Sequence, residues 1–230
     1  MKKAQAVFIA LFFASCLAAF PQSSVLKRGQ YGLGLSGVYA TNSGASGFSG
    51  IAGVSLGGIF DLSFSAGAAK YKPGQSEFAG LKTTSLGPEL QAHVIKQNSS
   101  RAPVSLALSI GYVRDNFRSP DLDAQQLRMW ANTFAVGATI YRDIPLVRGT
   151  YLQPYAGITY VNTSFKISDA QGLTLSNEDN MAAFTIGLPL VHSFSETTRL
   201  VVQPGLTFDK DTTTFAVSVG LVVALNKPGV

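Results

Sequence analysis

The sequence predicts an all-β protein: a closed antiparallel up-and-down β-barrel that crosses a membrane with about ten strands, or with eight in an alternative count. Three observations predict it. The chain opens with an export signal. It then repeats segments of about ten residues in which apolar side chains alternate with small or polar ones, and no segment carries a sustained helical stripe of apolar residues. We therefore expect no helix in the mature protein.

Residues 1–21 are predicted to be a cleaved signal peptide, with the cleavage site between 15 and 24. The basic start "MKK" precedes "AVFIALFFASCLAAF", an apolar run that is too short to span a bilayer comfortably. Cleavage after Ala18 or Ala19 discards Cys16, whereas cleavage just before Cys16 makes it a site of lipidation. Because Cys16 is the only cysteine, no disulfide is expected in the exported body.

The exported chain is predicted to be one domain. It comprises an N-terminal extension at 22–29, the barrel at 30–226 and a C-terminal tail at 227–230. The predicted strands are 30–40, 48–59, 62–71, 83–96, 103–114, 128–141, 150–162, 181–193, 199–209 and 212–226.

The last predicted strand contains "FAVSVGLVVALN", in which neither face carries a charge. Val219 belongs to its large apolar face and Ser218 to its small face. In a transmembrane barrel the apolar face meets lipid and the small or polar face lines the lumen. We therefore expect an arginine to be tolerated better at Ser218 than at Val219. The alternative is a soluble periplasmic barrel with its apolar face inside, which would leave an outer surface of Gly, Ala, Ser and Thr almost without charge.

The connections mostly alternate between long and short, which places the long ones at one rim of the barrel. "TNSGASG", "KPGQSEFAGLK", "DNFRSPDLDAQQ" and "ISDAQGLTLSNED" are expected to be long loops at that rim. An even number of strands puts both termini at the opposite, periplasmic rim. Aromatic residues near strand ends are typical of two interfacial girdles: Tyr39, Phe48, Tyr112, Trp130, Tyr160, Phe208 and Phe215 at the long-loop rim, and Tyr31, Phe60, Tyr151 and Phe194 at the other.

Four prolines inside predicted strands, Pro88, Pro154, Pro189 and Pro204, each remove one donor from the hydrogen-bond ladder. They count against a closed ladder.

The overall composition argues against nucleic-acid binding. The formal net charge is +5, and loss of Lys2 and Lys3 with the signal peptide lowers it to +3. Only 13% of the residues are charged, against about 25% in a typical soluble domain. No basic run or nucleic-acid motif is present, so the expected partners are outer-membrane lipid and a small-molecule or surface ligand of unknown identity.

Two stretches resemble known bacterial barrels. "YLQPYAGITY" is similar to a strand of small outer-membrane β-barrel domains of the opacity-protein and OmpA-like kind. The final strand resembles the assembly signal of outer-membrane barrels at Ser218, Gly220, Val223 and Leu225. The resemblance implies a location in the bacterial outer membrane, with the periplasm as the alternative, and recognition by the barrel assembly machinery.

Glu89, Gln91 and His93 share one face of a predicted strand and are expected to point into the lumen as a polar network. A carboxylate and an imidazole so close could also act as acid and base. We favour the network, and we take His192 as an interfacial residue. No metal site, cofactor or catalytic residue is predicted, because one Glu and one His are too few ligands and no phosphate-binding loop or nucleophile elbow occurs.

The sequence therefore predicts a non-enzymatic outer-membrane barrel that is structural, a narrow pore or a small-molecule carrier. Two alternatives remain open. One is an adhesin-like barrel that recognises surfaces through its outer loops, and the other is a barrel enzyme that acts on lipid or peptide.

Overall fold

A computed structural model describes residues 22–72, 76, 78–97 and 102–226. The predicted signal peptide with Cys16, and the tail at 227–230, lie outside these ranges. Within them, no helix has the length and apolar character needed to cross a membrane.

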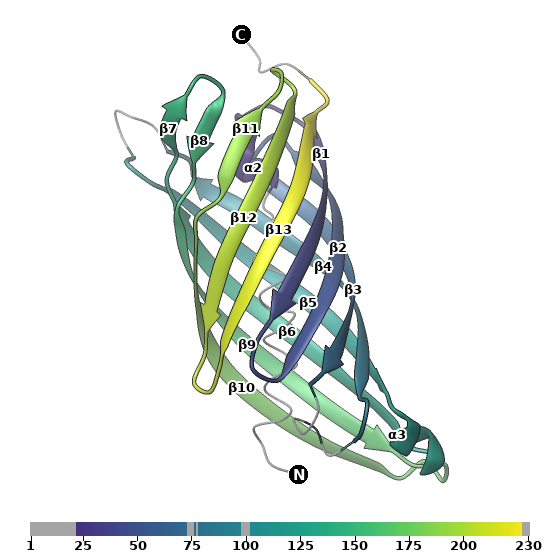
Figure 1. Ribbon diagram of the computed structural model, residues 1–230. Coiled ribbons are helices and arrows are strands. Elements are labelled where there is room, and N and C mark those ends of the chain that lie inside the picture. The colour runs from purple at the N-terminus through teal and green to yellow at the C-terminus, as the bar shows by residue number, and fades with distance from the viewer. Residues whose placement is uncertain (1–21, 73–75, 77, 98–101, 227–230) are drawn as a thin grey trace.

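Ten long antiparallel strands close into a barrel, as predicted (Figure 1). They are β1 (Gly32–Thr41), β2 (Ala45–Leu56), β3 (Phe60–Tyr71), β4 (Lys82–Ile95), β5 (Ser105–Arg118), β6 (Arg128–Tyr141), β9 (Tyr155–Ser168), β10 (Thr174–Gly187), β12 (Thr198–Phe208) and β13 (Thr213–Ala224). The first and last strands pair from Gly32↔Ala224 to Thr41↔Phe215, so no edge remains between them. Closure satisfies the backbone groups that lipid cannot hydrogen-bond.

Three short strands extend the barrel at one end: β7 (Ile144–Val147), β8 (Thr150–Leu152) and β11 (Leu190–Ser193). β8 and β11 continue the lines of β9 and β10 beyond interruptions at Pro154 and Pro189. Other backbone groups bridge these gaps, because Arg142 N donates to Pro154 O and Gln153 N donates to Pro189 O. The ladder therefore closes despite the prolines.

The two ends of the barrel differ (Figure 1). Both described ends of the chain lie at the end that carries β7, β8 and β11, where Tyr31 N donates to Asn226 Oδ1. We call this end the terminal rim and the opposite end the distal rim. The even strand number predicted that both termini would share one rim.

Two connections at the distal rim are shorter than predicted. β2 begins at Ala45, so "TNSGASG" is mostly strand around a tight turn, and β10 begins at Thr174 rather than at 181. The stretch Thr174–Asn180 lacks an apolar face, so alternation of lipid-facing residues did not predict it as strand. It pairs with β9 and extends the β9–β10 hairpin at the distal end.

The prediction that the mature chain has no helix was wrong. α2 (Gln22–Val25) lies inside the barrel at the terminal rim, and α3 (Pro120–Ala124) lies at the distal rim. α3 has a recognisable start, since the Ser119 side chain accepts a hydrogen bond from Leu122 N and Pro120 occupies the first turn. Both helices are too short to show an apolar stripe.

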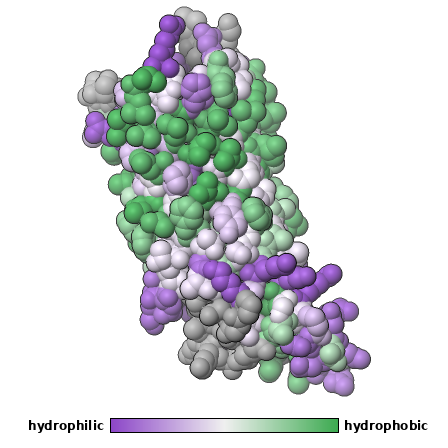
Figure 2. All heavy atoms as spheres, viewed as in Figure 1, coloured by the Kyte–Doolittle hydropathy of each residue, from purple (hydrophilic) through white to green (hydrophobic). Residues whose placement is uncertain are grey.

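The large apolar side chains point outward. Val219 is 50% exposed while its neighbour Ser218 is 1% exposed, and Leu35, Leu62, Leu90 and Ile110 are exposed in the same way. On the face shown in Figure 2, hydrophobic residues cover much of the middle, and hydrophilic residues gather most densely towards the distal end. Large apolar side chains on the outer face are typical of a barrel in lipid and not of a soluble barrel. Most of the predicted girdle aromatics are exposed, but Tyr151 instead packs against buried interior residues.

The interior is packed in three apolar layers separated by polar side chains. The terminal cluster comprises Val25, Leu26, Val191, Val201, Val222 and Ala224; the middle cluster comprises Val38, Ala40, Ile51, Ala69, Val113, Ala135 and Val161; the distal cluster comprises Leu81, Phe117, Leu122, Met129, Ala131 and Phe165. Two cavities between the described residues in the lumen measure only about 10 and 20 Å³. The lumen is therefore largely filled at the described residues that border these cavities.

Gly87 allows β4 and β5 to come close together. A Cβ at this position would overlap the carbonyl oxygen of Tyr112, a backbone atom that cannot rotate away. Gly87→Ala is expected to lower the free energy of unfolding by about 1–3 kcal/mol, as overpacking does in protein interiors. Urea unfolding in detergent, followed by the mobility of the folded barrel on gels, measures the change. The matched control is Gly37→Ala, where a Cβ meets nothing within 4 Å; equal effects of the two substitutions would contradict the close approach.

Candidate functional site

The described N-terminal segment, residues 22–30, enters the lumen at the terminal rim. Gln22, Ser23 and Gln30 are fully buried. Glycines make room for this segment: a Cβ at Gly34 would lie 2.5 Å from Gln22 Cγ, and a Cβ at Gly53 would overlap the Gln22 amide. The predicted N-terminal extension is therefore part of the barrel interior.

Asp61 binds the N-terminal segment to the barrel wall. Ser23 N donates to both carboxylate oxygens of Asp61, at 3.0 and 2.8 Å, and Ser23 Oγ lies 2.5 Å from Asp61 Oδ1. Ser23 Oγ also lies 2.6 Å from Ser55 Oγ. Asp61 is the second residue of β3 and is only 3% exposed. A buried carboxylate needs such donors, because its desolvation is otherwise very costly.

His93 lies on the other side of Asp61. Its Nε2 is 3.4 Å from Asp61 Oδ2, and its Nδ1 is 2.7 Å from the hydroxyl of Tyr141. The imidazole is 1% exposed and meets the Tyr141 ring edge to face. Ser23, Asp61, His93 and Tyr141 thus form a continuous polar chain across the lumen, which we call the terminal network.

The three residues of the predicted lumen network lie on the predicted inward face, but in the described part of the chain they do not bond to one another. Glu89, Gln91 and His93 all point inward from β4. Among the described residues, however, no hydrogen bond joins either Glu89 or Gln91 to His93; Gln91 instead borders the small cavity of about 20 Å³. Asp61 was not predicted as a lumen residue, because it lies between the predicted strands 48–59 and 62–71. The signal was present, since Asp61, Ser63 and Ser65 alternate with Leu62 and Phe64 in "FDLSFS".

Lys96 and Asp143 add charges at the terminal rim. Lys96 Nζ donates to Ser23 O and Leu26 O, so the ammonium is bound by the backbone of the N-terminal segment. Burial lowers the pKa of Lys96 to about 8, although the nearby Asp61 and Asp143 act in the opposite direction. Burial raises the pKa of Asp143, against the hydrogen bond from Gln153 and the charge of Lys96.

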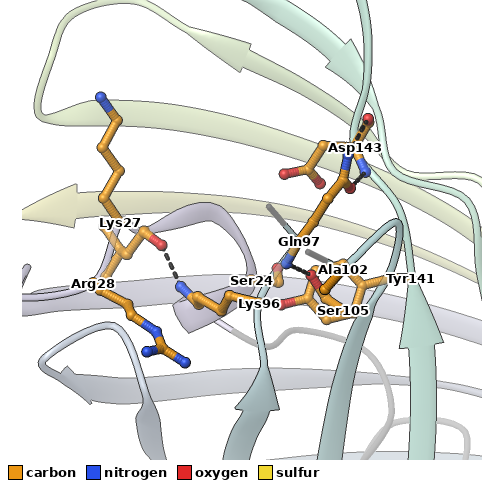
Figure 3. Close-up of a pocket in the computed structure, with 10 residues that line it drawn as sticks. Ser24, Lys27, Arg28, Lys96, Gln97, Ala102, Ser105, Tyr141 and Asp143 are labelled. Atoms are coloured by element: carbon orange, nitrogen blue, oxygen red, sulfur yellow. Dashed lines mark hydrogen bonds between the residues drawn. The ribbon is translucent and has the colours of Figure 1, made fainter. Parts of the chain in front are cut away.

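A pocket of about 490 Å³ opens beside these residues (Figure 3). Lys96 points towards the backbone of the N-terminal segment, and Gln97 lies against Asp143. Gln97 accepts from Asp143 N at 2.7 Å, while Gln153 donates to Asp143 Oδ1 at 2.8 Å. The full lining consists of Ser24, Leu26, Lys27, Arg28, Lys96, Gln97, Ala102, Ser105, Tyr141 and Asp143.

A second hollow of about 640 Å³ lies at the distal rim, between the α3 connection and the β9–β10 turn. Its lining residues are Asp123, Gln126, Leu127, Arg128, Ser168, Asp169, Ala170 and Gly172. It is a shallow surface of mixed charge rather than an enclosed site.

The remaining predicted residues lie at separate places. Ser218 and Gly220 of the assembly-like pattern are buried in β13, Val223 is half-buried, and Leu225 is exposed beyond the strand end. His192 accepts or donates a hydrogen bond at 2.8 Å with Thr150 Oγ1 and packs edge to face against Phe194.

The terminal network has the chemistry of a structural anchor. Its imidazole and carboxylate are covered, so a substrate would have to displace the N-terminal segment to reach them. The described residues contain no group of three or more His, Cys, Asp or Glu side chains arranged to hold a metal ion.

Comparisons with known proteins identify a fold but no family. No protein-family model matches the sequence, and no curated protein matches it either. The translocator domain of the autotransporter NalP from Neisseria meningitidis has a TM-score of 0.56 at 11% identity, over 94% of each chain. The beta domain of the Bordetella autotransporter Brka has a TM-score of 0.52 at 11% identity, over 86% of this chain and 99% of that one. The chain therefore has the closed β-barrel fold of bacterial outer-membrane proteins.

Proposed function

We propose that the protein is a non-enzymatic structural barrel of the bacterial outer membrane, with a lumen that is closed to solutes. The packed interior is the observation that carries this proposal. The middle cluster draws its residues from β1, β2, β3, β5, β6 and β9, so it crosses the barrel rather than coating one wall.

Two further features support a closed barrel. The N-terminal segment occupies the terminal mouth, where Val25 and Leu26 belong to the terminal cluster. At the distal end, Leu122 of α3 packs with Phe117 and Phe165 across the other mouth. A pore or carrier would need a continuous polar path, which the three apolar layers interrupt.

A non-enzymatic role agrees with the burial of the His93 side chain, which is inaccessible to a substrate from solvent. A general acid or base must come within hydrogen-bond reach of its substrate. His93 instead forms a hydrogen bond with Tyr141 through Nδ1, and its Nε2 lies 3.4 Å from the Asp61 carboxylate inside the protein. Among the described residues, the partners of the His93 imidazole thus come from the chain itself.

The outer membrane is the location that we propose, and its lipid and the barrel assembly machinery are the proposed partners. The apolar surface around the middle of the barrel supports contact with lipid (Figure 2). The pattern at Ser218, Gly220, Val223 and Leu225 supports recognition by the assembly machinery. In this arrangement the terminal rim faces the periplasm and the distal rim faces outward.

Planar-bilayer recording tests the closed lumen. The purified, heat-modifiable protein is expected to give no stable conductance steps, because cavities of about 10 and 20 Å³ hold at most single water molecules. A variant lacking residues 22–30 is recorded for comparison. It should also give no stable conductance steps, because the middle and distal clusters still close the lumen. Stable unitary steps from the intact protein would contradict the proposal and favour a narrow pore.

A further inference from the structure

Basic side chains gather on the outward face of the barrel towards the distal rim. Six of them come from five strands, and we call them the basic belt: Lys70, Lys82, Arg114, Arg118, Arg128 and Lys166. Five are exposed and Lys166 is half-buried. Each basic side chain lies on the outward face of its strand, the same face that carries the exposed apolar side chains.

Strand register brings several of these charges side by side. Lys70 pairs with Lys82 across β3 and β4, and Lys82 pairs with Arg118 across β4 and β5. Arg118 ends β5 and Arg128 begins β6, one position beyond the Phe117↔Met129 pair. Directly opposed side chains have Cβ atoms about 5 Å apart, and like charges at that spacing repel each other.

The protein compensates this repulsion only in part. In the described part of the chain, no residue of the basic belt forms an ion pair with a carboxylate. The acidic residue nearest in sequence to Arg114, Asp115, points inward and accepts a hydrogen bond from Ser85. Glu178 is an exposed acid on the outward face of neighbouring β10. Asp123 and Asp169 line the distal hollow together with Arg128. Lys70, Lys82 and Arg118 remain side by side, and an anion from outside the chain would relieve their repulsion.

The belt begins where the apolar surface ends. Along β5 the outward residues are Leu108, Ile110 and Tyr112, and the next outward residue is Arg114. Along β6, which runs the other way, Val136 and Phe134 are followed by Asn132, Trp130 and Arg128. The Arg114 guanidinium lies 6.0 Å from the centre of the Trp130 ring, an aromatic of the kind that is enriched at membrane interfaces. A basic side chain beside such an aromatic is typical of the level at which lipid headgroups meet a membrane barrel.

We propose that the basic belt binds the phosphate groups of a phosphorylated glycolipid in the outer leaflet. The inference rests on the proposed outer-membrane location, with the distal rim facing outward. Arginine and lysine are the side chains that recognise phosphate, and a row of them on adjacent strands matches an anionic headgroup layer. The acyl chains of the same lipid would lie on the apolar surface that continues from the belt, so the occupant has both an anionic and an apolar part.

The test measures stabilisation of the detergent-solubilised barrel by bisphosphorylated lipid A, by dephosphorylated lipid A and by inorganic pyrophosphate. The readout is the temperature at which the folded gel band is lost, titrated against each probe. Bisphosphorylated lipid A is expected to stabilise the protein most, with an effect that weakens as NaCl is added. Equal stabilisation by dephosphorylated lipid A, or full stabilisation by pyrophosphate alone, would overturn the proposal.

Paired substitutions locate the site. Lys82→Glu with Arg118→Glu is expected to weaken binding of bisphosphorylated lipid A at least ~10-fold, because each basic residue near an anionic lipid surface adds to the binding affinity. The neutral pair Lys82→Gln with Arg118→Gln should give a smaller loss, and it is the variant to use if charge reversal prevents folding. The matched control is Arg142→Glu with Arg148→Glu, two exposed positions at the terminal rim, which should leave binding unchanged.

Loss of binding in the control pair, or retention in both belt variants, would show that the belt is not the site. Failure of the proposed function gives a different result. A protein that is not heat-modifiable without lipid and does not fractionate with outer membrane would contradict the membrane location itself.

Discussion

Arginine in place of Val219 is expected to lower the free energy of unfolding of the inserted barrel by about 2–4 kcal/mol, the cost of a basic side chain on the lipid face near the midplane. Val219 lies at the centre of β13 and is 50% exposed on the outward face. A guanidinium there must lose hydration or reach for the nearest interface. Urea unfolding in phospholipid vesicles, followed by the folded gel band, measures the change.

Thr213→Arg is the matched control for Val219→Arg. Thr213 begins the same strand, has the same outward facing and lies at the distal rim, where water is accessible. It should change the free energy of unfolding by less than about 0.5 kcal/mol. If both arginine variants unfold at the same urea concentration, the apolar surface around Val219 is not covered by lipid.

Ser218 is unsuitable as the control, although alternation alone predicts that an inward arginine is tolerated better. The structure corrects this expectation. Ser218 is 1% exposed and borders a cavity of about 10 Å³ with Val38 and Gln203. A guanidinium does not fit in that space, so Ser218→Arg is expected to be severely destabilising as well.

Alternation predicted the faces of the strands because the side-chain period of a strand is fixed by its backbone. The strand at 128–141 has the predicted bounds, and Ser218 and Val219 face as expected. The strand count of ten also follows from local pattern. Thr174–Asn180 was not recognised as strand because it lies outside the apolar surface, and a strand in water needs no lipid-facing residues.

The terminal network could not be predicted from local pattern. Ser23 and Asp61 are 38 residues apart, and His93 and Tyr141 are 48 apart. Alternation predicts that such residues face inward. Which of them contact one another across a closed lumen depends on strand tilt and on the position of the N-terminal segment. The polar stretch "QSSV" was therefore assigned to an extension, although its hydroxyls and amides are what a buried carboxylate requires.

Asp61→Ala is expected to lower the free energy of unfolding by about 3 kcal/mol or more, because each buried donor left without its acceptor costs about 1–3 kcal/mol. The substitution leaves Ser23 N and Ser23 Oγ without their acceptor, and it leaves His93 Nε2 facing an empty space. Asp61→Asn keeps one acceptor oxygen and should fall between Asp61→Ala and the parent protein. Ser63→Ala, at the next inward position of β3, is the matched control and should cost far less.

A second measurement separates an anchor of the N-terminal segment from a simple core residue. Val25 is 6% exposed, so a Val25→Cys variant in a Cys16→Ser background should react slowly with a bulky maleimide. Adding Asp61→Ala should accelerate that reaction under conditions in which the barrel still migrates as the folded form, because the segment leaves the lumen before the strands separate. Adding Ser63→Ala should not. If Asp61→Ala destabilises the barrel yet leaves the cysteine protected until global unfolding, Asp61 supports the barrel wall and does not hold the N-terminal segment in place.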